Sequence, residues 1–317
     1  MKDEETRIDQ MVRAAWMYYI SGKNQSEIAS LLGTSRPVVQ RLLASAKEEG
    51  IISVNVNHPL SSCLDLALAL KEKFQFGECE IVPASVLDSS EEVLESVTFG
   101  GYQLMQRLLS PQPGKIIGIG SGMTLKRTIN RIEFSHESCE CVALISGMAK
   151  DGHCNYYDDV PLLLAQKIQA KYYQWPAPRH ALSLEDHQIW QRHPIYRNVV
   201  GKAHKADVIF IGVGGMGKTG PMLHDGFITY QESQQLESSG AVGEILGRFI
   251  DSQGAVLNCH SNTLITSFDI RETDCPRIAI ACGEEKRAAI LAAIHGQWIN
   301  GLVTDELTAK WLLQQTR

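Results

Sequence analysis

The sequence predicts a two-domain α/β protein, with a small helical N-terminal domain and a larger C-terminal domain built on a mostly parallel sheet. Its 317 residues are enough for two domains and a sizeable core. From residue 79 onward, short apolar runs alternate with amphipathic stretches, which is typical of a Rossmann-like sheet covered by helices on both faces. Residues 25–50 instead predict two short helices separated by a tight turn. We therefore expect one domain over residues 1–57 and another over residues 58–317.

The charge is distributed unevenly along the chain. The formal net charge is −6, which argues against a protein coated in nucleic acid. Residues 10–47 nevertheless contain five basic residues and one acidic residue, whereas residues 58–317 contain 23 basic and 29 acidic residues. A local basic face on an acidic body predicts one small nucleic-acid contact and a large domain with a different task.

The two helices predicted within residues 25–50 are separated at Leu32-Gly33-Thr34. Ser35 suits the N-cap of the second helix, because its hydroxyl can accept a hydrogen bond from a free backbone N–H of the first turn. Pro37 is compatible with that helix only near its start, where the missing N–H is not needed. The residues that recur at helical spacing and form the inward stripe are Val39, Leu42, Leu43 and Ala46.

The outward face of the second helix carries Arg36, Gln40 and Arg41, which is typical of a helix-turn-helix motif. Gln pairs with adenine and Arg with guanine in the major groove, and Arg also binds phosphate. An ordinary helical hairpin with a solvated basic face is the alternative. The candidate DNA-binding residues are Gln25, Ser26, Ser35, Arg36, Gln40 and Arg41.

The segments on either side favour the DNA-binding interpretation. Residues 8–20 predict an amphipathic helix that precedes the motif. Residues 51–56 alternate like a strand, as the wing of a winged helix-turn-helix domain would. We therefore predict that the N-terminal domain binds DNA.

The C-terminal domain is predicted to begin with a linking helix over residues 60–74. Predicted strands cover residues 79–83, 115–119, 139–145, 171–173, 207–212, 255–257, 277–281 and 301–304. Predicted helices cover residues 91–109, 124–131, 161–170, 240–250, 284–295 and 306–315. In a sheet of this kind, ligands bind in the loops at the carboxyl ends of the strands.

Two of these loops have the composition of an anion-binding turn. Residues 116–125, IIGIGSGMTL, run from a strand through small residues into a helix, and the free N–H groups of a helix start attract an anion. A tight turn without a ligand is the alternative. Residues 280–286, IACGEEK, place Lys286 one turn into a helix and within reach of a phosphate, although spacing alone favours a solvated surface lysine.

Residues 212–219, GVGGMGKT, satisfy both the phosphate-loop pattern of nucleotide hydrolases and the dinucleotide fingerprint. Both motifs require a helix that runs on directly from the loop, but Gly220-Pro221 cannot continue one. The dinucleotide motif also requires an acidic residue at the end of a later strand. Glu232 and Glu237 lie instead in a polar stretch, so the sequence disfavours both activities.

The sequence shows no metal site, no membrane segment and no cofactor site. None of the eight cysteines lies in a C-x-x-C pair, and Cys139 and Cys141 are interpreted as core residues on one face of a strand. Nothing resembles a signal peptide, and no apolar run reaches transmembrane length. We therefore expect a cytoplasmic protein with reduced thiols. The histidines without a metal-ligand pattern are His153, His180, His187 and His193.

Several segments together resemble the SorC family of sugar-responsive bacterial transcriptional regulators. They are QSEIASLLGTSRPVVQRLL, IGIGSGMTL, ADVIFIGVGG, GAVGEILGRFID and IACGEEKRAAILAAIHGQWINGLVTDELTAKWLL. The resemblance covers nearly the whole chain, and the last block is the most specific. It implies a C-terminal effector domain similar to sugar-phosphate isomerases and deaminases. It also implies two partners, operator DNA and a sugar or polyol that is usually phosphorylated. Finally, it implies assembly as a homotetramer.

The resemblance also implies which residues bind the effector. The loop from Gly120 to Leu125 and Lys286 would contact a phosphate, and Glu244 would accept hydrogen bonds from sugar hydroxyls. The complete set of candidate effector-binding residues is Gly120, Ser121, Gly122, Met123, Thr124, Leu125, Ser146, Gly147, Gly214, Glu244 and Lys286.

This sequence departs from the family pattern at two places. Related deaminases carry Asp-Gly-His in the loop where this chain has Met216-Gly217-Lys218, and methionine cannot transfer a proton. Ser146 stands where some relatives have Lys or Arg, which removes a cation and disfavours a bisphosphate or an imine-linked ligand. A sugar or polyol monophosphate, or a free polyol, fits better.

The sequence therefore favours a ligand-controlled transcription factor without catalytic residues. The rival hypothesis is a sugar-phosphate isomerase or deaminase with an appended N-terminal domain, and its candidate groups are Lys218, His224 and Asp225. Polar loop residues beside a ligand are the alternative interpretation of those three. A regulator that senses a nicotinamide cofactor is a third hypothesis.

Overall fold

The computed structural model describes residues 2–52, 61–109, 114–154, 159–218 and 220–316. The chain forms two compact units, an N-terminal unit, Met1–His58, and a C-terminal unit, Pro59–Arg317. Within the described ranges, every helix is either too short or too polar to span a lipid bilayer.

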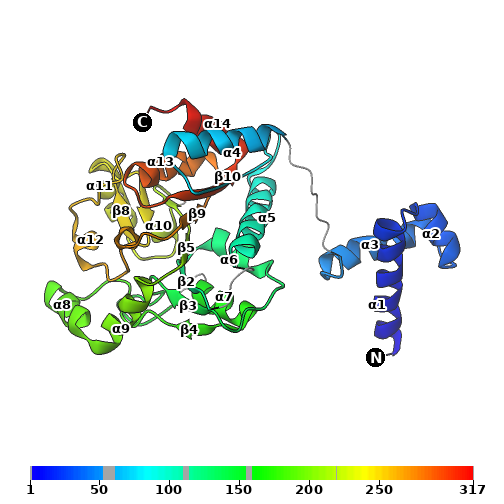
Figure 1. Cartoon of the computed structure of the whole chain (residues 1–317), viewed down its shortest axis with the longest axis horizontal. Helices are drawn as coiled ribbons and strands as arrows, with labels where there is room; N and C mark the ends of the chain where they lie inside the picture. The colour runs from blue at the N-terminus through cyan, green and yellow to red at the C-terminus, as the bar shows by residue number, and fades with distance from the viewer. Residues whose placement is uncertain (1, 53–60, 110–113, 155–158, 219, 317) are drawn as a thin grey trace. The chain divides into compact units, whose positions relative to one another are not determined.

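The described part of the N-terminal unit contains α1 (Lys2–Ala15), α2 (Gln25–Leu31) and α3 (Arg36–Glu48), with a π-helical segment, Trp16–Ile20, that extends α1 (Figure 1). The apolar side chains of the three α-helices share one small core, in which Met11, Ile28 and Val39 are fully buried. The predicted helix-turn-helix arrangement is therefore confirmed at the level of the backbone.

Local sequence explains where the helices of the N-terminal unit begin and end. The Asn24 side chain accepts hydrogen bonds from the N–H groups of Ser26 and Glu27, and the Glu27 carboxylate accepts one from the Asn24 N–H at 2.8 Å. This capping box satisfies the free donors at the start of α2. Gly33 has a φ of +63° in the turn, a conformation that glycine adopts without strain.

One expectation for the N-terminal unit needs correction, and another lies mostly outside the described residues. Ser35 occupies the N-cap position of α3, as predicted, but its hydroxyl makes no capping hydrogen bond, so only the predicted hydrogen bond is wrong. The wing predicted over residues 51–56 lies outside the described residues apart from Ile51 and Ile52, which pack against the core of the unit.

A seven-stranded sheet forms the centre of the C-terminal unit, with the strand order β1-β10-β9-β5-β2-β3-β4. Every pair of neighbouring strands in it is parallel, as predicted. The strands are β1 (Glu78–Val82), β2 (Ile116–Ile119), β3 (Glu140–Ala143), β4 (Lys171–Tyr173), β5 (Val208–Ile211), β9 (Arg277–Ile280) and β10 (Gly301–Asp305).

Helices cover both faces of this sheet (Figure 1). The central strand β5 shows why, because Ile209 and Ile211 enter one core while Val208 and Phe210 enter the other. The first core is completed by α4 (Ser61–Phe74), α9 (Pro194–Ala203), α13 (Arg287–His295) and α14 (Glu306–Gln314). The second core is completed by α5 (Ser90–Leu109), α6 (Met123–Asn130) and α7 (Val160–Ile168).

The helix predicted over residues 240–250 is wrong. These residues form the hairpin of β7 (Gly243–Ile245) and β8 (Arg248–Ile250), which joins β6 (Gly214–Gly215) in a small antiparallel sheet. The turn places Leu246 and Gly247 at φ angles of 49° and 80°. A Cβ atom at Gly243 would lie 2.4 Å from the Cβ of Ala289, so the hairpin packs against α13 at a distance that only glycine permits. Helical spacing of apolar residues misled the prediction because it could not show this packing.

Other differences concern the segments outside the main sheet. The strand predicted over residues 255–257 is wrong, since Val256 forms only a single bridge with Ile250. The helix predicted over residues 284–295 begins with a 3-10 turn, Glu284–Lys286. The helices that were not predicted are α8 (Leu184–Arg192), α10 (Pro221–His224), α11 (Tyr230–Ser238) and α12 (His260–Leu264), together with α9.

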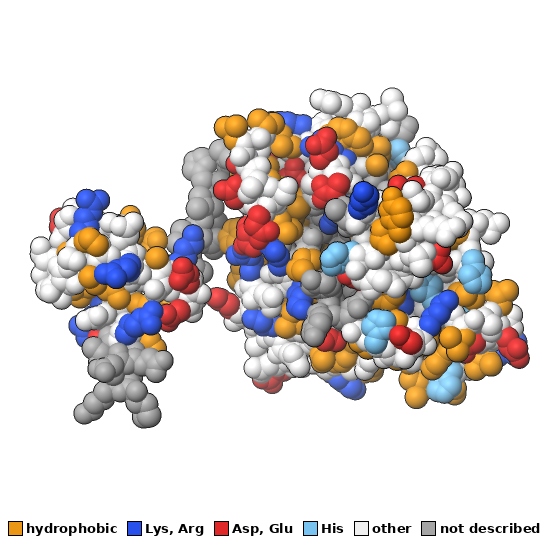
Figure 2. Space-filling model, turned by 180° about the vertical axis from the view of Figure 1, so that it is seen from behind, with side chains coloured by type: hydrophobic (Ala, Val, Ile, Leu, Met, Phe, Trp, Pro, Cys, Tyr) orange, Lys and Arg blue, Asp and Glu red, His pale blue; other side chains and the backbone are white. Residues whose placement is uncertain are grey.

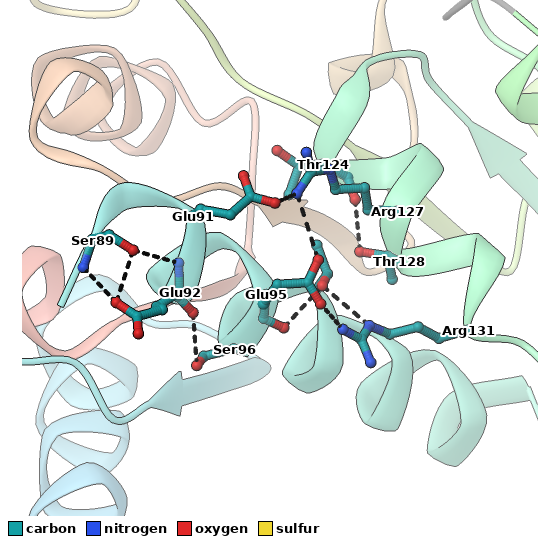
Figure 3. Close-up of polar contacts among 10 residues, drawn as sticks. Ser89, Glu91, Glu92, Glu95, Ser96, Thr124, Arg127, Thr128 and Arg131 are labelled. Atoms are coloured by element: carbon teal, nitrogen blue, oxygen red, sulfur yellow. Dashed lines mark hydrogen bonds and ion pairs between the residues drawn. The ribbon is translucent and has the colours of Figure 1, made fainter. Parts of the chain in front are cut away.

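Charged side chains attach α6 to α5, as Figure 3 shows. Arg127 of α6 pairs with Glu91 and lies 3.5 Å from Glu95, and Arg131 pairs with the other oxygen of Glu95. These side chains are partly exposed, so each pair contributes little to stability. Their combined effect is to hold the axis of α6, and with it the loop that precedes the helix, against α5.

Asp305 connects the end of β10 to two neighbouring segments. Its buried carboxylate accepts hydrogen bonds from the Thr308 N–H at 2.8 Å and the Thr308 hydroxyl at 2.7 Å, which cap α14. It also accepts one from the Gly283 N–H at 3.2 Å. One side chain therefore holds the start of α14 and the turn that leads to Lys286.

We predict that Asp305→Ala lowers the free energy of unfolding of the C-terminal unit by about 2–3 kcal/mol, because it leaves buried donors without an acceptor. Urea denaturation of the full chain, followed by tryptophan fluorescence, measures this loss. Asp305→Asn keeps one acceptor oxygen and should lose clearly less. Equal losses in the two variants would contradict the role given to these hydrogen bonds.

Candidate functional site

A cavity of about 360 Å³ lies at the carboxyl ends of the central strands β2 and β5. Its wall comes from the start of α6, the β7–β8 hairpin, α10 and the turn before α13. The lining residues are Ser121, Gly122, Met123, Thr124, Ile145, Arg179, Gly212, Val213, Gly214, Pro221, Met222, His224, Asp225, Glu244, Leu246, Gly247 and Lys286.

The start of α6 presents free backbone donors to the cavity. Gly122 has a φ of 118° and precedes the helix, and its carbonyl accepts the N–H of Lys126 at 3.0 Å. The N–H groups of Met123, Thr124 and Leu125 therefore have no acceptor within the helix, and such a terminus attracts an anion. The Leu125 side chain is buried in the core, and Leu125 lies outside the cavity lining.

Glu244 lies in the opposite wall, on β7. One of its oxygens accepts a hydrogen bond from the Gly247 N–H at 2.7 Å. The other lies 2.2 Å from the position that a Cβ atom would take at Gly214, so only glycine fits there. Burial raises the pKa of Glu244 above its ordinary value of 4.5, while the Gly247 N–H, Arg179 and Lys286 act against that rise.

Lys286 reaches the same cavity from the turn before α13. Its N–H donates to the Gly283 carbonyl at 3.1 Å, and the Gly283 N–H is itself held by Asp305. A Cβ atom at Gly215 would meet the Glu285 carbonyl at 3.2 Å, so this turn packs closely on β6. The position of the Lys286 ammonium group therefore depends on segments that are far apart in the sequence.

Arg179 lines the cavity but was not among the residues that the sequence predicted. Its side chain is buried in the cavity wall, where Nε donates to the Ser146 carbonyl at 3.0 Å and the guanidinium lies 3.7 Å from the centre of the Phe227 ring. It therefore places a cation directly beside Ser146. A proline-rich segment, Trp175-Pro176-Ala177-Pro178, directly precedes it in the sequence.

The cavity gathers some of the predicted effector residues and leaves others outside its lining. Those that line it are Ser121, Gly122, Met123, Thr124, Gly214, Glu244 and Lys286, and those that do not are Gly120, Leu125, Ser146 and Gly147. Ser146 is buried, and its hydroxyl accepts the Met148 N–H at 3.0 Å while its carbonyl binds Arg179. Its contacts thus position Arg179.

The three groups considered for acid–base chemistry do not meet in the cavity. His224 and Asp225 line it, with 2.9 Å between Nδ1 and Oδ1. Lys218 is exposed and lies outside the lining. Among the residues that the structure describes, no three His, Cys, Asp or Glu side chains are grouped to hold a metal ion.

Most of the candidate DNA-binding side chains are exposed on the N-terminal unit. Ser26, Ser35, Arg36, Gln40 and Arg41 are exposed, and Gln25 is partly buried. Gln25 Oε1 lies 3.5 Å from Arg36 Nε, which joins the starts of α2 and α3. Neither Arg36 nor Arg41 forms an ion pair within the described ranges. Figure 2 shows Lys and Arg side chains at several places on the surface of this unit.

Comparison with known proteins identifies the family of this chain. A family model described as "Putative sugar-binding domain" matches residues 58–314. The Erythritol catabolism regulatory protein EryD of Brucella abortus (strain 2308) is 29% identical over 308 residues, which cover 96% of each chain. The Transcriptional regulator LsrR of Escherichia coli (strain K12) is 30% identical over 317 residues, covering 96% of this chain and 95% of LsrR.

A solved structure matches both units together. The full-length Sorbitol Operon Regulator SorC from Klebsiella pneumoniae has a TM-score of 0.74 at 27% identity, over 97% of this chain and 99% of that chain. A helical N-terminal unit joined to a sugar-binding α/β domain defines a class of transcriptional regulators, and the relatives named above are regulators rather than enzymes. Within that class, the chain belongs to the SorC family.

We predict that Glu244→Gln stabilises the ligand-free protein at neutral pH. Because the pKa of Glu244 in the folded protein is raised above 4.5, the free energy of unfolding falls as the pH rises through that folded-state pKa. The uncharged amide of glutamine does not titrate, so the variant does not suffer this loss. The Tm of the variant should therefore exceed that of the wild type near pH 7. The two values should converge below pH 4.5, where both side chains are neutral.

Glu285→Gln is a suitable control for this prediction, since it makes the same change on an exposed neighbouring residue. Its Tm should follow the wild type at every pH. A Glu244→Gln variant that is less stable than the wild type at neutral pH would contradict the prediction.

Proposed function

We propose that the chain is a DNA-binding transcriptional regulator of a carbohydrate or polyol utilisation operon, controlled by a sugar or polyol phosphate that binds in the cavity. The observation that carries this proposal is that one cavity combines an anion-attracting helix start and Lys286 with the carboxylates of Glu244 and Asp225. The helix start and Lys286 suit a phosphate. The two carboxylates suit hydroxyl groups, since carboxylates accept hydrogen bonds.

The size and charge of the cavity narrow the ligand class. A volume of about 360 Å³ lies at the small end of ligand pockets and suits one monosaccharide or polyol phosphate. Arg179 and Lys286 are cations, while Glu244 and Asp225 bear carboxyl groups, so the wall is balanced in charge and suits a polar ligand with a single phosphate. Two relatives have names that refer to erythritol and sorbitol, which supports a polyol.

A panel of tetritol, pentitol and hexitol phosphates and their unphosphorylated forms tests the proposal on the full chain. A ligand at about a hundred times its Kd stabilises the protein by about 2.7 kcal/mol, which a thermal-shift measurement detects. We expect at least one phosphorylated polyol or sugar to raise the Tm and none to be converted to product. Turnover that depends on His224 and Asp225 would favour an enzyme instead.

We predict that Lys286→Met weakens binding of the phosphorylated effector about tenfold or more, because a charge-assisted hydrogen bond contributes about 1.5–3 kcal/mol. The affinity for the unphosphorylated form should change little. Isothermal titration of both ligands measures the difference, and Lys205→Met, an exposed lysine outside the cavity lining, is the matched control. Equal losses for the two ligands would show that Lys286 does not bind the phosphate.

We propose that Arg36 and Gln40, on the exposed face of α3, contact the bases of the operator. Gln25, Ser26, Ser35 and Arg41 would contact the surrounding DNA backbone and bases. A regulator of this kind binds symmetric half-sites, so we propose that an oligomer, a dimer of dimers, presents the N-terminal units to DNA. Its place of action is then the cytoplasm, where operator DNA lies.

We predict that Arg36→Ala and Gln40→Ala each reduce the difference in binding free energy between operator and random-sequence duplexes by about 1–3 kcal/mol. Sequencing of duplexes selected from a random library measures this discrimination. Lys47→Ala removes an exposed cation from the far end of α3 and should weaken binding without changing the preferred sequence. Full sequence preference in the Arg36 and Gln40 variants would show that another surface reads the bases.

A further inference from the structure

A second cavity, of about 290 Å³, lies in the C-terminal unit. Among the described residues, its lining has no member in common with the lining of the first cavity. Its wall comes from the loop after β3, the loop before α8, the segment between α10 and α11, α11 itself and the start of α12. The lining residues are Lys150, His180, Phe227, Ile228, Glu232, Gln235, Leu236, Ser239, Cys259, His260 and Ser261.

Part of this wall is apolar. Ile228 and Leu236 are buried, and Phe227 is half-buried beside them in the same small hydrophobic cluster. A cavity that combines apolar side chains with a few polar groups is typical of a site for an organic molecule. Its volume, at the lower limit of ligand pockets, suits a small one.

His180 is the buried polar group of the second cavity, with only 6% of its surface exposed. Its Nε2 lies 2.9 Å from the Ser261 hydroxyl oxygen. Burial lowers the pKa of His180 to about 4, so the imidazole is neutral at pH 7. The other ring nitrogen, Nδ1, makes no hydrogen bond within the described part of the chain. If the Ser261 hydroxyl donates to Nε2, Nδ1 carries the proton and can donate it to a ligand.

Lys150 brings a positive charge to the same cavity. Its side chain is exposed and makes neither an ion pair nor a hydrogen bond with the residues that the structure describes. The Glu232 carboxylate is already engaged, since one oxygen accepts the Thr229 N–H at 2.7 Å and the Thr229 hydroxyl at 2.8 Å. These hydrogen bonds, and then the charge of Lys150, lower the pKa of Glu232. A ligand therefore gains more from pairing with Lys150 than from pairing with Glu232.

We propose that the second cavity binds a small organic acid. The carboxylate of the acid pairs with Lys150 and accepts a hydrogen bond from His180 Nδ1. Its carbon atoms pack against Phe227, Ile228 and Leu236. A phosphate dianion suits this cavity less well, because it would bring two negative charges to a single cation that already lies near a carboxylate.

The second cavity lies next to the first. Arg179 lines the first cavity and the following residue, His180, lines the second. The Phe227 ring, which lines the second cavity, lies 3.7 Å from the Arg179 guanidinium. A test of the proposal must therefore show which cavity a ligand occupies. The proposal itself does not rest on the function proposed for the first cavity.

Isothermal titration of the full chain with benzoate and hexanoate tests the binding of an acid, with benzamide and hexanamide as the uncharged counterparts. We expect at least one acid to bind about tenfold or more tightly than its amide, because the amide loses the charge-assisted hydrogen bonds. Lys150→Met should raise the Kd of that acid about tenfold. Lys205→Met, which changes an exposed lysine outside both linings, should leave the Kd unchanged.

Two cysteines locate the bound acid. Cys259 lines the second cavity and is partly buried, whereas Cys154 is exposed and lies outside both linings. Iodoacetamide alkylation of the native full chain, followed by mass spectrometry of its peptides, measures the reaction of each thiol. The bound acid should slow the alkylation of Cys259 and leave that of Cys154 unchanged in the same sample.

The proposal is overturned if neither acid binds, if acid and amide bind equally well, or if Lys150→Met binds the acid as tightly as the wild type. An acid that binds without slowing the alkylation of Cys259 would also overturn it. A polyol phosphate in the first cavity should bind Lys150→Met and the wild type alike. If it binds neither protein, the proposed function fails while the result for the acid stands.

Discussion

The cavity of the C-terminal unit is built around one partly buried carboxyl group, that of Glu244. One of its oxygens occupies the space that a side chain at Gly214 would fill, and the other accepts a hydrogen bond from the Gly247 N–H. The β6–β7–β8 sheet is therefore built around this carboxyl group. Burial raises the pKa of this group, and Arg179 and Lys286 offset part of that cost. A group that costs stability in the ligand-free protein is typical of a binding site, where a ligand supplies the missing partners.

The remaining parts of the site hold other groups at fixed positions around that carboxyl group. Ion pairs join α6 to α5, and the first residues of α6, Met123 and Thr124, line the cavity. Asp305 holds the turn that carries Lys286, and the Ser146 carbonyl and the Phe227 ring hold Arg179. These supports come from segments that are far apart in the sequence, so the shape of the cavity depends on the packing of the whole domain.

Much of the fold was predictable from sequence because local signals agreed with the final packing. The strands of the parallel sheet are short apolar runs, and burial on both faces requires them to be apolar throughout. The helix-turn-helix pair carries Gly33 at its turn and an apolar stripe on α3. The segment over residues 240–250 shows the opposite case. Its apolar spacing suits a helix, but the close approach of Gly243 to Ala289 and the turn at Leu246-Gly247 select a hairpin.

The sequence by itself determined the parallel sheet, the basic helix pair and the small-residue loops that follow the strands, because each depends on residue types that lie close together in the chain. Only the tertiary structure decided which of those loops share a cavity and that Arg179 joins them. Arg179 lies in a loop without periodicity, and its role comes from contacts with Ser146 and Phe227, which are distant in sequence. Such contacts depend on how the elements pack, and no local pattern of residues records that packing.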